Sequence, residues 1–238
     1  MGRTLFFASL CLLAAAGARA ELLAEYSCVR PRPVDPGSWT NASLAASLLH
    51  GTVVKPGARF SFLRCVELGR GRFVRGRSLS NGRVVMSKGG GICQVSTALY
   101  NAVLLAGLSV TDRRSHSFYD DVDAYVEPGR DAAVSGSAGK DFCFENRGST
   151  AVTISAAAVD GRVSVQVWGD QTAPPRRWLL TRSTRIPKTR AQKPVARRGF
   201  DGWRVERSLA VLDAAGTTSL VLLEPDFYPM IPERAAKP

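Results

Sequence analysis

The stretch GGGICQVSTALYNAVLLAG, residues 89–107, sets three glycines and an isoleucine before a cysteine and a helical pattern. After Cys93 the apolar residues recur every three or four positions, as the buried face of a helix requires: Val95, Ala98, Leu99, Ala102, Val103 and Ala106. Gly107 follows where a left-handed residue commonly ends a helix. The pattern predicts the best-defined helix of the chain, beginning near Cys93.

Around this helix the chain reads as short strands separated by turns. Asn81-Gly82 and Asp160-Gly161 are typical of two-residue hairpin connections, and residues 203–212 and 218–223 form another alternating pair. A shorter helix is expected over 42–49, capped by Thr40 or Asn41. We therefore expect an α+β fold in which antiparallel sheets pack on the central helix, with a small C-terminal β-hairpin unit.

The N-terminal residues indicate export. Arg3, an apolar run over 5–13 and the small residues of Ala18-Arg19-Ala20 are typical of a cleaved secretory signal peptide. The run is shorter than the roughly 20 residues that span a bilayer, so no membrane span is expected after cleavage. The expected organisation is a signal peptide (1–20), an extended lead-in (21–37), a main domain (38–172), a basic linker or solvated strand pair (173–200) and a small β unit (201–238).

The chain is basic, with 32 Lys and Arg against 20 Asp and Glu and a formal net charge of +12. Such a surface suits a polyanionic partner, although a solvated basic face is an equally simple explanation. Since export is expected, nucleic acid is disfavoured. Peptidoglycan or another anionic polymer of the cell envelope is the partner we expect.

Four cysteines remain after the signal segment: Cys28, Cys65, Cys93 and Cys143. In an oxidising compartment they can form two disulfides, or one disulfide and two free thiols. No CxxC pair occurs, and the two histidines, His50 and His116, lie far apart in sequence. This spacing disfavours zinc, so neither a metal nor a cofactor is expected.

Cys93 is the candidate nucleophile. A helix N-terminus favours the thiolate because its unpaired N–H groups and dipole stabilise negative charge. Gly89, Gly90 and Gly91 leave space for a substrate carbonyl to approach their amides, which with those of Ile92 and Gln94 can form an oxyanion hole. The alternative is that the glycines only make a tight turn and Cys93 is buried.

A cysteine nucleophile needs a base, and His116 lies in a polar loop after the central helix. Asp131 is the first candidate to orient the imidazole, with Asp120, Asp121 and Asp123 as alternatives. Three arginines, Arg113, Arg114 and Arg130, are candidates for binding a substrate carboxylate. His50 ends the shorter helix, where a structural role is expected.

Over residues 38–170 the sequence resembles the VanW family of bacterial envelope proteins. The resemblance rests on Lys55-Pro56-Gly57, Phe60-Ser61-Phe62, Asn81-Gly82, the stretch 89–108, Arg114 with His116, and the segments 128–132 and 141–146. Some VanW-domain proteins are linked to peptidoglycan cross-linking as L,D-transpeptidases with an essential cysteine, which here corresponds to Cys93.

Two functions follow from these expectations. In the first, the protein is a cysteine-dependent acyl-transfer enzyme that acts on peptidoglycan stem peptides through a Cys93 thioester. In the second, it is a non-catalytic accessory module that binds the envelope, and Cys93 is structural.

Overall fold

The computed structural model describes residues 20–30, 34–67, 69, 71–80, 83–121, 123–170, 175–191 and 195–235. The expected signal peptide falls on residues outside this set except for Ala20, and so does the Asn81-Gly82 turn.

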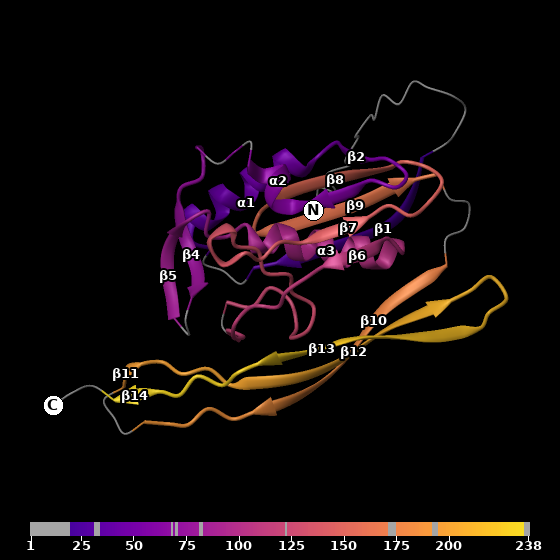
Figure 1. The fold of residues 1–238 in the computed structure, drawn as a ribbon. Helices are drawn as coiled ribbons and strands as arrows, with labels where there is room; N and C mark the ends of the chain where they lie inside the picture. Colours follow the sequence, from indigo (N-terminus) through magenta and orange to yellow (C-terminus); the bar gives the residue numbers. More distant parts are fainter. Residues whose placement is uncertain are drawn as a thin grey trace, which may run out of the picture.

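The main body is built on a four-stranded antiparallel sheet (Figure 1). Its strands, in spatial order, are β1 (Glu21–Val29), β9 (Arg162–Gly169), β8 (Val152–Val159) and β2 (Thr52–Val54). Asp160 and Gly161 both have positive φ and join β8 to β9, which confirms the predicted hairpin. Alternate residues of β9, including Val163, Val165 and Val167, are fully buried, so one face of the sheet meets the core.

Two long helices cover that face. The central helix α3 (Cys93–Ala106) packs on β1 and β9, and α1 (Pro36–Leu49) packs on β8. Gly107 ends α3 in the left-handed conformation, as predicted. The start of α1 at residue 42 was wrong, because Asp35 caps the helix by accepting a 2.7 Å hydrogen bond from Ser38 N and Pro36 occupies the first turn.

Smaller elements complete the main body. They are a three-stranded sheet of β3 (Arg59–Ser61), β7 (Cys143–Glu145) and β6 (Ser109–Asp112), the helix α2 (Phe62–Glu67), a 3₁₀ turn (Gly136–Ala138) and the hairpin of β4 (Arg75–Ser80) and β5 (Arg83–Lys88). The hairpin stands at one end of the body (Figure 1). This arrangement is an α+β fold, as expected from the sequence.

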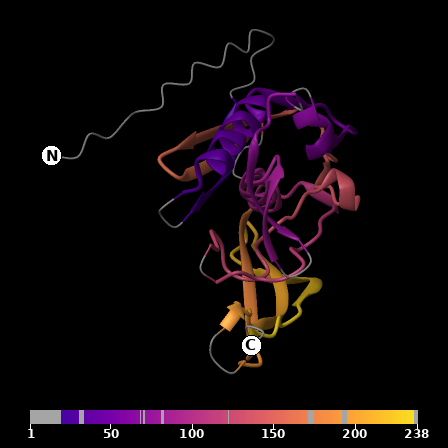
Figure 2. The same cartoon turned by 90° about the vertical axis from the view of Figure 1, so that its left-hand side faces the viewer.

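The C-terminal residues form a second sheet that lies beneath the body in both views (Figures 1 and 2). It contains the three long strands β10 (Arg176–Ile186), β12 (Gly202–Leu212) and β13 (Thr218–Tyr228). The short strands β11 (Val195–Arg197) and β14 (Arg234–Ala235) pair with each other in a separate two-stranded sheet. Leu179 of β10 and Leu209 of β12 join the main hydrophobic core, so the sheet is docked on the body.

Two segments of the expected organisation form strands. The extended lead-in forms β1, which pairs with β9 along its length. The basic segment 173–200 contains β10, which pairs with β12 over eleven residues, and the short β11. No helix within the described residues is long and apolar enough to cross a bilayer.

Candidate active site

The three glycines before Cys93 allow two close backbone approaches. Gly91 has φ +108°, and a Cβ on it would lie 2.3 Å from the carbonyl oxygen of Ser38. A Cβ on Gly90 would lie 2.2 Å from the carbonyl oxygen of Gly76. Only glycine fits at these positions. The turn is thereby packed between the start of α1 and β4, which fixes where α3 begins.

Most of the amides proposed for an oxyanion hole are engaged within this turn. The backbone hydrogen bonds are Gly89 N to Val74 O (3.0 Å), Gly90 N to Ser87 O (3.1 Å), Ile92 N to Gly89 O (3.4 Å) and Gln94 N to Gly91 O (3.2 Å). These four N–H groups already have acceptors. Within the described part of the chain, the amides of Gly91 and Cys93 have no backbone acceptor, and the Cys93 amide lies in the first turn of α3.

Cys93 is half-buried and lines a groove. Its Sγ lies 3.5 Å from both the backbone N and the backbone O of Val134. The N–H of Val134 therefore donates a hydrogen bond to the sulfur, which stabilises a thiolate more than a thiol. The sulfur is held by the chain that follows Asp131.

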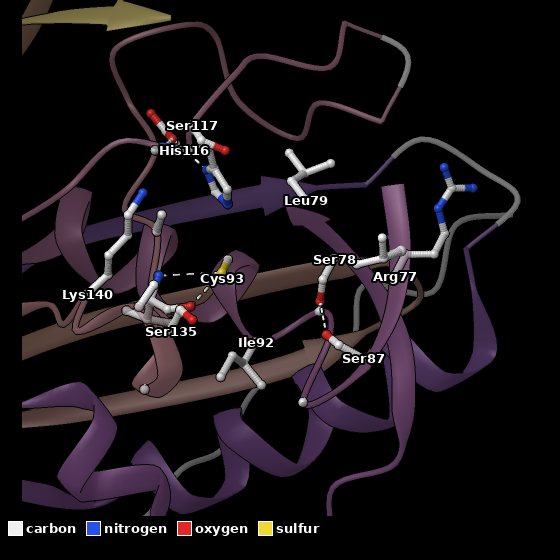
Figure 3. Close-up of a pocket in the computed structure, with 18 of the residues that line it drawn as sticks. Arg77, Ser78, Leu79, Ser87, Ile92, Cys93, His116, Ser117, Ser135 and Lys140 are labelled. Carbon is white, nitrogen blue, oxygen red and sulfur yellow. Dashed lines mark hydrogen bonds and ion pairs between the residues drawn. The ribbon is translucent and has the colours of Figure 1, made fainter. Parts of the chain in front are cut away.

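His116 and Asp131 meet beside this sulfur. The Nδ1 atom of His116 lies 2.5 Å from Oδ2 of Asp131, and the same oxygen accepts the backbone N–H of His116 at 2.8 Å. Asp131 therefore holds both the ring and the backbone of His116. Nδ1 is engaged by Asp131, and the His116 ring lies on the same side of the groove as the Cys93 sulfur (Figure 3).

The three groups shift one another's pKa. Burial opposes ionisation of Cys93, but the hydrogen bond and charge of His116 outweigh burial and lower the pKa of the thiol. Burial likewise disfavours the imidazolium, yet hydrogen bonds to Asp131 and Cys93 raise the pKa of His116 to about 10. Both directions favour a thiolate–imidazolium pair at neutral pH.

The other oxygen of Asp131 is held from the C-terminal sheet. Tyr228, at the end of β13, donates its hydroxyl proton to Oδ1. Arg113 lies 3.1 Å from the same oxygen and donates through Nε to the backbone carbonyl of Asp131 at 2.7 Å. Burial would raise the pKa of Asp131, but the hydrogen bond and charge of His116, the charge of Arg113 and the hydrogen bond from Tyr228 lower it well below its usual range.

Asp226 on β13 holds Arg113 in place through an ion pair and is itself paired with Arg207 on β12. Its Nη1 atom lies 2.5 and 2.6 Å from the two carboxylate oxygens of Asp226, and Arg207 lies 3.3 Å from that carboxylate. Arg207 also donates to the hydroxyl of Tyr100 on α3. Sequence reasoning missed Tyr228, Asp226 and Arg207, because only the docking of the terminal sheet brings them to Asp131.

The groove beside Cys93 has a volume of about 1400 Å³. The β4–β5 hairpin forms one wall, with Ser78 and Ser87 hydrogen-bonded to each other at 2.6 Å (Figure 3). Residues 116–120, 123–126 and 133–138 form other walls. Arg30 from the end of β1 and Tyr125 also line it. The groove is open to solvent and large enough for a peptide.

The arginines expected to bind substrate lie elsewhere. Arg113 is buried in the ion pairs described above, whereas Arg114 is 68 % exposed and pairs with Asp112. Arg130 pairs with Glu127 and donates to the carbonyl of Leu179. None of the three lines the groove. In the structure all three arginines form ion pairs, and Arg113 and Arg130 also donate hydrogen bonds to backbone carbonyls.

Gln94 and three of the candidate acids also have structural partners. Gln94 is buried and donates from Nε2 to the carbonyls of Cys28 (3.2 Å) and Gly161 (3.1 Å). Asp120 and Asp121 pair with Arg198, and Asp123 pairs with Arg77. Of the four acids considered, Asp131 is the one bonded to His116.

The remaining candidates are placed away from the groove. Nδ1 of His50 accepts a 3.3 Å hydrogen bond from the backbone of Ala156. All four cysteines of the described residues are free thiols, so neither disulfide arrangement forms. Among these residues no cluster of three His, Cys, Asp or Glu side chains is arranged to hold a metal.

Comparison with known sequences places this site in a family. The family profile described as VanW like protein matches residues 37–168, more than half of the chain. The chain belongs to the VanW family. The matched region contains Cys93, His116 and Asp131, but it ends before the C-terminal sheet that supplies Tyr228.

Two curated relatives match this VanW protein. The uncharacterized protein YoaR of Bacillus subtilis (strain 168) is 35% identical over 160 residues, covering 65% of this chain and 48% of YoaR. The vancomycin B-type resistance protein VanW of Enterococcus faecalis (strain ATCC 700802 / V583) is 34% identical over 93 residues, 38% of this chain and 32% of that protein. The chain thus spans half or less of each relative. No solved structure matches it significantly.

Proposed function

We propose that this member of the VanW family is an exported enzyme of the cell envelope that transfers acyl groups of peptidoglycan stem peptides through a Cys93 thioester and forms L,D cross-links. The observation that carries the proposal is the alignment of Cys93, His116 and Asp131 at the edge of a groove. Membership of a family with a vancomycin-resistance protein supports the envelope setting.

The first half-reaction follows from the contacts of the three side chains. The Cys93 thiolate attacks the carbonyl carbon of the donor peptide, and the carbonyl oxygen gains the negative charge. The Cys93 amide is a donor to this oxygen, a contact typically worth about 10²–10³ in rate. As the intermediate collapses, His116 gives its proton to the leaving amine, and the thioester remains on Cys93.

In the second half-reaction the proton moves from the attacking amine to His116. An amine of a second stem peptide attacks the thioester, and His116, now neutral, takes the proton that the amine loses. The new amide forms, and the Cys93 sulfur leaves as a thiolate beside the imidazolium. Water in place of the amine gives hydrolysis, so a peptidase would use the same residues.

The alternative is a non-catalytic module in which Cys93 is structural. That function expects a fully buried or disulfide-bonded sulfur. Cys93 instead is half-buried and free, and its pKa is lowered by a histidine that a buried carboxylate orients. These contacts support the enzymatic proposal over the accessory one.

The test is to incubate the purified protein with sacculi and with a synthetic stem tetrapeptide, and to measure muropeptides and the intact protein mass. We expect new cross-linked or hydrolysed products and a mass increase equal to the acyl group. Cys93→Ala should lose both, whereas Cys65→Ala, which removes a thiol that does not line the groove, should keep both. Identical products from wild type and Cys93→Ala would rule out the proposal.

A further inference from the structure

Arg30 is a cation in the groove whose charge is not balanced by an ion pair within the described residues. It follows directly after β1 and lines the groove together with Cys93 and Tyr125. Within the described residues no carboxylate pairs with it. By comparison, Arg77, another arginine of the groove, is paired with Asp123.

The position of the Arg30 guanidinium is fixed by uncharged groups. Its Nε lies 3.4 Å from Oε1 of Gln94, whose Nε2 is anchored to two backbone carbonyls. Its Cζ lies 5.1 Å from the centre of the Tyr125 ring, over the ring face. The stacking and the Nε contact leave the terminal nitrogens of the planar fork for a ligand.

Tyr125 supplies the surface on which the guanidinium lies. Its ring lines the groove beneath Arg30, whereas its hydroxyl is buried near the side chain of Thr97 on α3. The ring is therefore the part of Tyr125 that holds the Arg30 guanidinium in the groove.

Both groups lie close to the sulfur. Gln94, whose Oε1 holds the Arg30 Nε, directly follows Cys93 at the start of α3, and Arg30, Tyr125 and Cys93 all line the same groove. The charge of Arg30 is also among the contributions that lower the pKa of Cys93. A negative group bound by Arg30 therefore lies next to the bond that Cys93 attacks.

We propose that Arg30 and Tyr125 form a subsite for a carboxylate of the acyl donor, adjacent to the scissile carbonyl. The inference rests on the proposed function, because it names the donor of the same reaction. A stem peptide offers two such groups: the terminal carboxylate of the leaving residue and the α-carboxylate of the glutamate further up the stem. The terminal carboxylate is only two bonds beyond the scissile nitrogen, so it is the better fit beside the sulfur.

The test measures binding without chemistry, in the Cys93→Ala protein. The probes are the stem tetrapeptide L-Ala-γ-D-Glu-L-Lys-D-Ala, the same peptide amidated at its C-terminus, and the peptide amidated at the glutamate. We expect terminal amidation to weaken binding by about 10- to 100-fold, as for loss of a charge-assisted hydrogen-bonded pair. Weakening by glutamate amidation instead would assign the subsite to the other carboxylate.

Variants in the same background separate Arg30 from the general charge of the groove. Arg30→Gln should abolish the discrimination between acid and amide, and Arg30→Lys should restore part of it. Lys88→Gln removes a positive charge from β5 in the same groove and should retain the discrimination. Thermal unfolding confirms that each variant folds.

The outcomes distinguish this inference from the proposed function. Equal binding of acid and amides, or no binding of any peptide, overturns the carboxylate subsite, even if wild-type protein forms the Cys93 thioester. Discrimination that depends on Arg30 upholds the subsite, even if wild-type protein forms no thioester and the proposed function fails.

Discussion

The hydroxyl of Tyr228 donates a hydrogen bond to Oδ1 of Asp131, the carboxylate whose other oxygen binds His116. The two residues come from different parts of the fold, since Tyr228 ends the last long strand and Asp131 lies in the loop after β6. The orientation of the His116 ring thus depends on the docked C-terminal sheet.

Replacing Tyr228 by phenylalanine removes this hydrogen bond while keeping the ring. We expect thioester formation to slow by about 10-fold, equivalent to ~1.4 kcal/mol, because Asp131 orients His116 less firmly. Tyr119→Phe is the matched control, since Tyr119 packs on Tyr228 with ring centres 5.9 Å apart but donates to the carbonyl of Val126. Equal rates for the two variants would contradict a positioning role of Tyr228.

Asp131→Asn tests which acid orients the histidine. The amide keeps the shape but lacks the negative charge that fixes the Nδ1–H tautomer, and a loss of about 10³–10⁴ in acylation rate is expected. Asp123→Asn, which breaks a pair with Arg77 and does not reach His116, should stay within a few-fold of wild type. Rates of acyl-enzyme formation measured by intact mass give the comparison, and a larger effect at Asp123 would refute the assignment.

The pH dependence of Cys93 alkylation reports the thiolate–imidazolium pair. A free thiol has a pKa of about 8.5. Because His116 lowers the pKa of Cys93, alkylation by iodoacetamide should reach half its maximal rate at a pH below that value. In His116→Gln the half-maximum should move above that value, because burial then acts on the thiol without the compensating charge.

The other three cysteines provide the control for that titration. Burial raises the pKa of Cys28 and Cys65, and Cys143 shifts in the same direction. Peptide mapping after a short pulse at pH 7 should therefore find the label mainly on Cys93. Labelling spread evenly over the four thiols would show that Cys93 is not activated.

Alanine substitutions separate the two reasons why glycine is needed before Cys93, which are a positive φ and the close approach of another backbone segment. Gly89 and Gly91 both have positive φ, but a Cβ on Gly89 meets no atom within 4 Å, whereas one on Gly91 meets Ser38 O at 2.3 Å. Gly89→Ala should cost about 1–2 kcal/mol of unfolding free energy from its φ alone. Gly91→Ala should cost roughly 1–3 kcal/mol more because the backbone must shift. Denaturant unfolding measures both, and equal losses would refute the close-packing argument.

The central helix could be predicted because its signals are local. The apolar spacing after Cys93 and the cap at Gly107 define α3 within nineteen residues. His116 could be chosen because the sequence offers only two histidines, and Asp131 could be named as the first of four candidate acids. That these two side chains meet beside Cys93 did not follow from the sequence.

The remaining features depend on pairings between distant segments. The residues before Arg30 carry no signal that they pair with β9, and that pairing is what brings Arg30 to the groove. Tyr228 and Asp226 lie in a strand whose alternation predicts a hairpin but not its docking partner. The glycine amides illustrate the same limit, because their acceptors on Val74 and Ser87 are set by the β4–β5 hairpin.

The support of Asp131 by β13 bears on how the protein should be divided for experiments. A fragment trimmed to residues 37–168 would keep the whole matched region and all three side chains at the sulfur. It would also lose β1 with Arg30, and it would leave Asp131 without Tyr228 and Arg113 without Asp226. An inactive fragment of that length would report on missing supports, so the chemistry of Cys93 should be judged on the full chain.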